Sequence, residues 1–187
     1  MRKAGIPINI KNTNKPDDPG TMIVETAGND SCIYTITGIA GHRGFVTVTI
    51  EKDMMNAELG FGRKVLEVFE NYNISFEHMP SGIDTMSIVV HKDEFEEKEA
   101  LLVHSLRTAV NPDKIDRDIA LIAVVGRGMK SQRGTAARIF AALAHAKVNV
   151  KMIDQGSSEL NVIVGISNDD FETSIKAIYD IFVTQRL

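Results

Sequence analysis

The sequence repeats itself at an offset of 74 residues, and this repeat constrains the fold more than any other feature. Gly60 opens the helical run GFGRKVLEVFENYNI, and Gly134, 74 residues later, opens the run GTAARIFAALAHAKV. The similarity extends without a gap over residues 43–91 and the matching residues 117–165. The repeat therefore predicts two related supersecondary units.

Both copies predict the order strand, helix, strand, strand, helix. In the first copy, FVTVTI (45–50) alternates as a half-buried strand, and apolar residues then follow at helical spacing. ISFEHM (74–79) and TMSIVV (85–90) flank a turn, and a second helix is expected to stop near Asn111-Pro112. In the second copy the helices are expected at about 132–146 and 169–183. With a fourth strand, each copy becomes a ferredoxin-like βαββαβ unit of the α+β class, with two helices on one face of an antiparallel sheet.

The fourth strands indicate how the two units are connected. DKIDRD (113–118) is the candidate for the first unit. The second unit runs out of chain after Phe182, and CIYTITGI (32–39) is the strand-like run still unassigned. We therefore expect the first unit to be inserted into the second. We also expect the two to pack together, because units of roughly 70 residues are marginally stable alone.

Residues 1–27 differ from the rest of the chain. IPINI (6–10) alternates like a short strand, and KNTNKPDDPGT (11–21) is rich in turn formers. Such a segment cannot bury a core of its own. It is expected to be the tail of something larger or an arm that lies on a partner.

Composition restricts the classes of partner. The net charge of -4 and the pI near 5.7 argue against nucleic acid and anionic membranes. RNA-binding domains share the βαββαβ order but need aromatic residues on the central strands, where this sequence has mainly Val, Ile, Thr and Met. The sequence has no secretory signal, no long apolar run and a single cysteine, Cys32. The expectation is a soluble cytoplasmic protein.

The stretch 74–84 holds the side chains of a hydrolase or a metal site: Glu77, His78, Ser81 and Asp84. The five histidines, however, show no paired helical spacing, and no Gly-x-Ser-x-Gly motif is present. GRGMKSQRG (126–134) fails the spacing of both the dinucleotide and the P-loop motif. A packed, hydrogen-bonded His78 is favoured over a catalytic one.

A glycine-containing loop joins the first strand to the first helix in both copies, at 54–62 and 126–135. A helix N-terminus after such a loop offers free backbone N–H groups to a carboxylate. The second strand would add Ser75 and Glu77 in the first copy, and Asn149 and Lys151 in the second. This pattern suits a zwitterionic or cationic amino acid. The alternative is that the glycines only permit a turn and tight packing.

The segments ISFEHMPSGIDTMSIVV and IALIAVVGRGMKSQRGTAARIFAALAHAKVNVKMIDQGSSELNVIVGI resemble the regulatory region of aspartate kinases (aspartokinases), which consists of two ACT domains. GIPINIKNTNKPDDPGT is similar to the end of the catalytic domain in the same enzymes. The resemblance implies a remnant of that catalytic domain at 1–27. It also implies a first, effector-binding ACT domain at 40–117 and a discontinuous second ACT domain at 28–39 and 118–187.

The resemblance also implies a function. The family's catalytic domain binds ATP and magnesium and phosphorylates L-aspartate to 4-phospho-L-aspartate. Almost all of that domain would precede residue 1, so this chain is expected to hold no catalytic residue, no metal and no cofactor, and to be inactive alone. It would be a piece of a longer enzyme or a separate regulatory subunit.

By the same resemblance, the effector is lysine, possibly with threonine, bound at the interface of a homodimer formed through the ACT domains. The catalytic domain or subunit would be the other partner, and feedback inhibition the outcome. Lysine's α-carboxylate would meet backbone N–H groups near Gly60 and Phe61, and Glu77 or Asp84 would pair with an ammonium group. The residues implicated are Met55, Asn56, Glu58, Gly60, Phe61, Ser75, Phe76, Glu77, Ser81 and Asp84.

Two further expectations concern the second copy and the competing class of function. Lys151 stands at the position of Glu77, and Arg133 at that of Leu59. This reversal of charge disfavours a second cationic ligand, so the second unit is expected to be structural and interfacial.

The alternative for the whole chain is a dimerisation module that binds no effector.

Overall fold

The computed structural model describes residues 4–24, 34–110, 114–130 and 132–184. The chain divides into two compact parts, Met1–Ile33 and Tyr34–Leu187. In the first, β1 (Ile8–Ile10) pairs antiparallel with β2 (Thr21–Ile23), and every residue of both strands is exposed. The predicted strand within 6–10 is confirmed, whereas its partner β2 was not predicted. As expected, the hairpin buries no core of its own.

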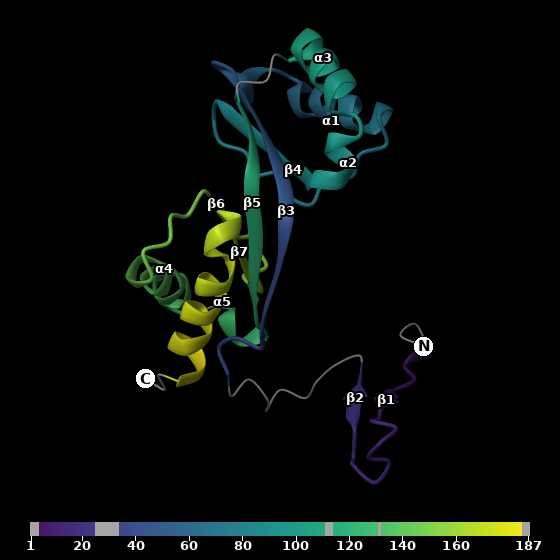
Figure 1. The fold of residues 1–187 in the computed structure, drawn as a ribbon, viewed down its shortest axis with the longest axis vertical. Helices are drawn as coiled ribbons and strands as arrows, with labels where there is room; N and C mark the ends of the chain where they lie inside the picture. Colours follow the sequence, from purple (N-terminus) through teal and green to yellow (C-terminus); the bar gives the residue numbers. More distant parts are fainter. Residues whose placement is uncertain (1–3, 25–33, 111–113, 131, 185–187) are drawn as a thin grey trace. The chain divides into compact units, whose positions relative to one another are not determined.

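The larger part, residues 34–187, is built on one antiparallel sheet of five strands in the order β4-β3-β5-β7-β6. Two long strands, β3 (Gly38–Glu51) and β5 (Lys114–Val125), pair along most of their length (Figure 1). β4 (Thr85–His91) flanks β3, while β7 (Asn161–Ile166) and the short β6 (Met152–Asp154) continue the sheet from β5. The sheet therefore extends through both repeats.

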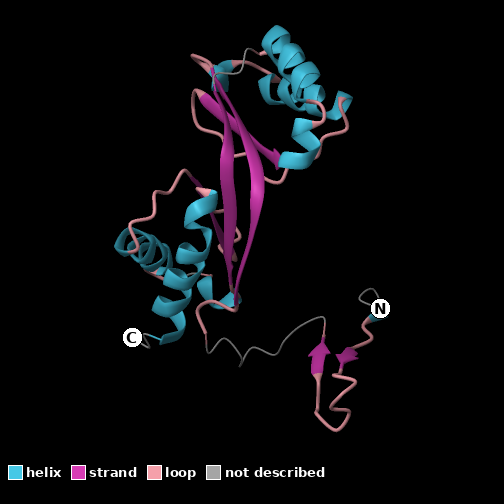
Figure 2. Ribbon diagram, viewed as in Figure 1, coloured by secondary structure: helices cyan, strands magenta, loops and turns pink. Residues whose placement is uncertain are grey.

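The helices gather in two groups at opposite ends of the long strands (Figure 2). One group contains α1 (Phe61–Asn71), α2 (Lys92–Glu96) and α3 (Glu99–Ala109). The other contains α4 (Thr135–His145) and α5 (Phe171–Tyr179), which continues as a π-helical turn over Asp180–Thr184. The second helix of the first unit is thus broken into α2 and α3, and the expected stop at Asn111-Pro112 lies outside the described residues.

The internal repeat is confirmed in the backbone. Gly60 and Gly134 precede α1 and α4 with φ of 77° and 83°, and Asn73 and Lys147 follow these helices with φ of 50° and 58°. The next amide in each copy bonds back to the helix, from Ile74 to Phe69 and from Val148 to Leu143, both at 3.0 Å. Equivalent positions therefore adopt equivalent conformations 74 residues apart.

Each helix group covers its own core. In the first unit, Val46, Val48 and Ile50 of β3 pack with the buried residues of the helices, among them Phe69, Phe95, Leu102 and Leu106. In the second, Ile122 and Val124 of β5 pack with Ile139, Leu143 and Ile178. A third cluster joins the strands where the units meet, with members Phe45, Val89, Ile119, Leu121 and Ile163. The predicted α+β fold of two packed ferredoxin-like units, the first inserted into the second, is confirmed.

The fourth strands are only partly as predicted. Residues 114–118 pair with β3 through Thr49↔Lys114 and Thr47↔Asp116, as expected for the first unit. The strand proposed at 32–39 is wrong in position, because residues 34–37 form no strand and β3 begins at Gly38. The start of β3, from Gly38↔Val125 to His42↔Leu121, fills the place in the second unit instead. Since β3 and β5 run through both units without a break, the residue limits expected for the two ACT domains stay predictions.

The strand expected at 74–79 is replaced by an irregular segment. It makes isolated bridges, His78↔Val89 and Ser81↔Met86, rather than a continuous ladder. The amide of Glu77 bonds to Val89 O at 2.8 Å, and the amide of Val89 bonds to His78 O at 2.9 Å. The segment therefore lies along β4 without forming a regular strand.

None of the described helices combines the length and the apolar character needed to cross a bilayer.

The two left-handed glycines give a test of the repeat. Gly60→Ala and Gly134→Ala should each lower the free energy of unfolding by about 1 kcal/mol, because a Cβ is disfavoured at positive φ. Nothing lies within 4 Å of the Cβ position at either site, so steric overlap adds no cost. Chemical denaturation monitored by circular dichroism measures the change.

Gly156→Ala is the matched control, since its Cβ would also meet nothing within 4 Å and its φ is not in the left-handed region. Equal effects at all three positions would contradict the conformational explanation.

Candidate effector site in the first unit

The loop between β3 and α1 is held against the turn that precedes β4. The amide of Lys52 bonds to Asp84 O at 2.8 Å, and the amide of Met54 bonds to Asp84 Oδ1 at 2.9 Å. The amide of Asn56 bonds to Ile83 O at 3.2 Å. Asp84 thus fixes the loop through its backbone and its side chain, and the turn before β4 is held against residues 52–56 of the loop.

The start of α1 is an open helix N-terminus. Gly60 precedes the helix in a left-handed conformation, and no side chain caps it. Met55 and Phe61 are buried at 5% and 4% exposure, so they anchor the loop in the core. The first backbone N–H groups of a helix lack intrahelical acceptors and carry partial positive charge. The Phe61 N–H already donates to Glu58 O at 3.3 Å, so the N–H groups that follow it are the ones that can receive a carboxylate.

Charged side chains surround this helix end. Glu58 forms ion pairs with Lys52 and with Lys64, the latter at 2.6 Å. Hydrogen bonds from Lys52 and then Lys64 lower the pKa of the Glu58 carboxyl, which therefore stays ionised. The Lys52 ammonium also lies 5.2 Å from the centre of the Phe61 ring. The loop thus combines backbone donors with the carboxylates of Glu58 and Asp84.

The other predicted residues lie at the far end of β4. The Ser75 amide and hydroxyl approach Glu94 Oε2 at 3.3 and 3.4 Å, and Glu77 Oε1 lies 3.1 Å from His91 Nε2. Glu77 and Ser81 are four positions apart in the sequence, so their Cα atoms would be about 13 Å apart in an extended chain. The structure therefore brings Asp84 to the loop that carries Met55, Asn56, Glu58, Gly60 and Phe61, and leaves Ser81 in the turn before β4, where it bridges to Met86. It places Ser75, Phe76 and Glu77 at the other end of β4. Which of the ten residues contact an effector stays a prediction.

Large apolar side chains are exposed on the loop and the turn. Leu59 is 98% exposed, Met54 71% and Ile83 69%. The bond between Asn56 N and Ile83 O brings the two segments together. Clustered exposed apolar residues around a polar site are typical of a surface that a partner covers.

Several residues at these sites were missed by the sequence analysis. Lys52 and Lys64 stand six residues before and after Glu58, whereas His91 ends β4 and Glu94 lies in α2. No local spacing marks them, because they reach the site through loop closure and strand pairing. His78 is packed, as predicted: its side chain is 23% exposed and its Nδ1 lies 3.3 Å from Asp154 Oδ2. Among the described residues, no group of three His, Cys, Asp or Glu side chains is arranged to hold a metal.

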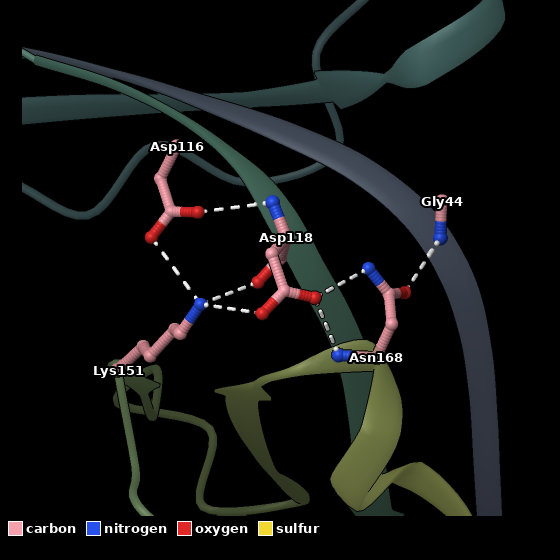
Figure 3. Close-up of polar contacts among 5 residues, drawn as sticks. All are labelled: Gly44, Asp116, Asp118, Lys151 and Asn168. Carbon is pink, nitrogen blue, oxygen red and sulfur yellow. Dashed lines mark hydrogen bonds and ion pairs between the residues drawn. The ribbon is translucent and has the colours of Figure 1, made fainter.

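The equivalent loop of the second unit lacks the acidic groups. Gln132 and Ser158 stand where the first unit has Glu58 and Asp84. Lys151, the counterpart of Glu77, donates to Asp118 O at 2.6 Å, Asp118 Oδ2 at 3.1 Å and Asp116 Oδ2 at 3.3 Å (Figure 3). This cation is engaged inside the chain, in agreement with a structural role for the second unit.

Asp118 is the centre of this polar network. Its Oδ1 accepts from both the backbone and the side-chain nitrogen of Asn168, each at 2.9 Å. Asn168 Oδ1 in turn accepts from Gly44 N at 3.3 Å, at the register shift between β3 and β5 (Figure 3). The backbone N–H of Asn168, followed by other donors that include Lys151, holds the pKa of Asp118 far below its usual range. The network thus ties β5, β3 and the start of α5 together through one carboxylate.

Comparison with known proteins gives consistent results. A model of the ACT domain family matches residues 122–182. The chain is 37% identical over 183 residues to aspartokinase 3 of Bacillus subtilis, a match that covers 96% of this chain and 40% of the relative. It is similar to the crystal structure of Clostridium acetobutylicum aspartate kinase, with a TM-score of 0.89 and 48% identity, over 97% of this chain and 43% of that one.

One solved structure of a separate regulatory subunit has a similar fold. The ligand-free regulatory subunit of aspartate kinase from Thermus thermophilus matches with a TM-score of 0.67 and 22% identity, over 79% of this chain and 99% of that one. By contrast, the chain spans about 40% or less of the length of the first curated relatives it matches.

The Asp118 network predicts a pH-dependent stability. Because the pKa of this carboxyl is lower in the folded than in the unfolded chain, where it is about 3.9, its stabilising effect is present above that value. The effect is lost as the pH falls through and below it. Asp118→Asn should lower the free energy of unfolding by about 1 kcal/mol near neutral pH, a modest value because the side chain is 53% exposed.

Urea denaturation of the parent and the variant between about pH 3 and pH 7 measures this difference, which should shrink below about pH 4. Glu172→Gln, at a carboxylate that is 84% exposed, is the control for the loss of one negative charge. A difference for Asp118→Asn that stayed constant down to pH 3 would contradict the role of the ionised carboxylate.

Proposed function

Since this chain belongs to the aspartokinase family and forms its regulatory ACT region, we propose that it senses a free amino acid and thereby regulates aspartate kinase. The observation that carries this proposal is the arrangement around the start of α1. The loop that leads into the uncapped N-terminus of α1 is fixed by Asp84 through two hydrogen bonds, from Lys52 N and Met54 N. The second unit keeps the loop but not the carboxylates, which argues that they serve recognition rather than the fold.

Lysine is the proposed effector, with threonine as a second candidate. Its α-carboxylate would accept from backbone N–H groups near Gly60 and Phe61. Its α-ammonium or side-chain ammonium would face Asp84, whose Oδ1 accepts from Met54 N and whose Oδ2 makes no hydrogen bond or ion pair with a described residue. The relative Escherichia coli aspartokinase III, solved in complex with lysine and aspartate, has the same fold at a TM-score of 0.77 and 18% identity.

A homodimer fits the two groups of predicted residues. Glu77 lies at the other end of β4 from the loop, so one ligand would be served by both groups only if a second copy of the chain supplied one of them. The exposed Met54, Leu59 and Ile83 surround the loop and would be covered in such a dimer. A ligand that bridges two chains favours one dimer arrangement over another.

Feedback inhibition follows from such a preference. An effector shifts an enzyme only by its differential affinity for two states, typically about 1–3 kcal/mol of coupling. The catalytic part of the enzyme, on a preceding domain or a separate subunit, would hold ATP, magnesium and aspartate. The chain alone would have no aspartate-dependent ATP turnover.

A dimerisation module without an effector is the second candidate. It is favoured by one observation, that Glu58 and Glu77 already have cationic or histidine partners within the chain. In that case these charges would stabilise the loop and the edge segment, and no ligand would be needed.

Titration calorimetry of the chain with L-lysine, L-threonine and L-methionine separates the two candidates. Lysine should bind, and Asp84→Asn should weaken binding by about tenfold, because one charge-assisted contact is lost. The amide keeps an oxygen that can accept from Met54 N, so the loop itself should persist.

Glu172→Gln, remote and exposed, is the charge-matched control and should bind as the parent does. No heat with any of the three amino acids at millimolar concentration would favour the dimerisation module. Binding of lysine that is unaffected by Asp84→Asn would show that the pairing is wrong.

A further inference from the structure

A polar cavity lies behind the sheet of the first unit, on the face turned away from α1, α2 and α3. It has a volume of about 320 Å³. Strand pairing explains its floor, because Thr47 is opposite Asp116 and Thr49 is opposite both Lys114 and Ser87. The alternation that buries Val46 and Val48 against the helices turns the two threonines to the other face. The residues that line the cavity are Thr47, Thr49, Ser87, Lys114, Asp116, Ile119, Asn149, Lys151 and Met152.

The roof of the cavity comes from the second unit and is firmly held. It consists of Asn149, Lys151 and Met152, at and just before the start of β6. The three acceptors around Lys151 Nζ fix this segment to β5. Farther along β6, Asp154 forms the ion pair with His78 of the first unit. The cavity is therefore a built space between two segments that several polar contacts hold together.

One polar atom in this cavity lacks a partner in the described part of the chain. Thr47 is 8% exposed, and its Oγ1 is buried without a hydrogen bond to any described residue. The neighbouring hydroxyls of Thr49 and Ser87 satisfy each other at 3.1 Å. A buried hydroxyl without a partner is destabilising, so native chains rarely retain one that has no use.

The charges and donors around Thr47 indicate the chemistry of the missing partner. Lys114, Asp116 and Lys151 line the cavity, and the Asp118 carboxylate lies 3.1 Å from Lys151 Nζ, so Asp116 and Asp118 together offset Lys151 and the positive charge that faces a ligand is that of Lys114. Lys151 is committed to its three acceptors, whereas Lys114 is exposed and makes no polar contact with described side chains. The hydroxyl of Thr47, the ammonium of Lys114 and the amide of Asn149 are then the donors available to a ligand.

We propose that this cavity binds a small oxyanion, a carboxylate or phosphate group, with one oxygen accepting from the Thr47 hydroxyl and another facing the Lys114 ammonium. The site is separate from the loop at 52–60 and does not depend on the function proposed for that loop. Because its floor belongs to the first unit and its roof to the second, an occupant would stabilise the junction of the two.

The test is a thermal-shift titration of the 187-residue chain with inorganic phosphate and, separately, with malonate, each against chloride of equal ionic strength. At least one of the two anions should raise the melting temperature in a saturable way. Thr47→Val keeps the shape of the side chain and removes the hydroxyl. It should fold at least as stably as the parent without anion, and its apparent affinity should fall about tenfold.

Lys114→Gln should weaken the response similarly and guards against a folding defect in the first variant. Lys176→Gln, at an exposed lysine of α5, is the charge-matched control and should respond as the parent does. Because neither Thr47 nor Lys114 belongs to the loop, failure of this site and failure of the loop site are distinguishable. A response to phosphate alone, or to malonate alone, would assign the ligand class. The proposal is overturned if neither anion gives a saturable shift, which would leave water as the partner of Thr47, or if Thr47→Val responds like the parent.

Discussion

The antiparallel pairing of β3 with β5 is the interaction on which the rest of this structure depends. Each unit of the repeat has only about 70 residues and would be marginally stable alone. The first half of β3 pairs in the sheet of the second unit, and its second half packs in the core of the first unit. The first half of β5 pairs in the sheet of the first unit, and its second half packs in the core of the second unit. The register of this pair shifts between His42 and Thr47, and the network of Asp118 and Asn168 supplies Gly44 N with a partner there. The junction of the two units is therefore a hydrogen-bonded continuation of one sheet rather than a flexible linker.

The elements that local physics determines were predictable. Glycine at the start of α1 and α4 is required by the positive φ, and the apolar spacing of both helices is preserved across the repeat. The start of β3 was not predictable, because GIAGHRG (38–44) has neither the alternation nor the residue types of a strand and becomes extended through pairing with 121–125. The reverse error occurred at ISFEHM (74–79), where a strand-like sequence lies at the edge of β4 and bonds only in part. In both segments the pairing partner, which is remote in sequence, decided the outcome.

The candidate site shows the same division. The loop residues from Met55 to Phe61 and the turn at Asp84 were identified from the sequence, and backbone hydrogen bonds bring them together. The sequence did not show that Ser75 and Glu77 lie at the other end of β4, with Glu94 and His91 as neighbours. Strand direction separates residues that are only a few positions apart in the chain. Nor did it show that Lys52 and Lys64 converge on Glu58, since Glu58 lies in an irregular loop between a strand and a helix, where no regular period places side chains.

The comparison of the two units explains how one supersecondary pattern acquires different roles. In the first, the carboxylates of Glu58, Glu77 and Asp84 stand at the surface, where a soluble ligand or a second chain can reach them. In the second, the position of Glu77 is taken by Lys151, which is directed inward to Asp116 and Asp118. A carboxylate at 151 would face these two carboxylates and would be repelled, so the cation belongs to the junction rather than to a ligand. The same segment that carries Lys151 also forms the roof over Thr47. Any ligand in that cavity would thus contact the junction directly, whereas a ligand at the loop of the first unit would act on it from a distance.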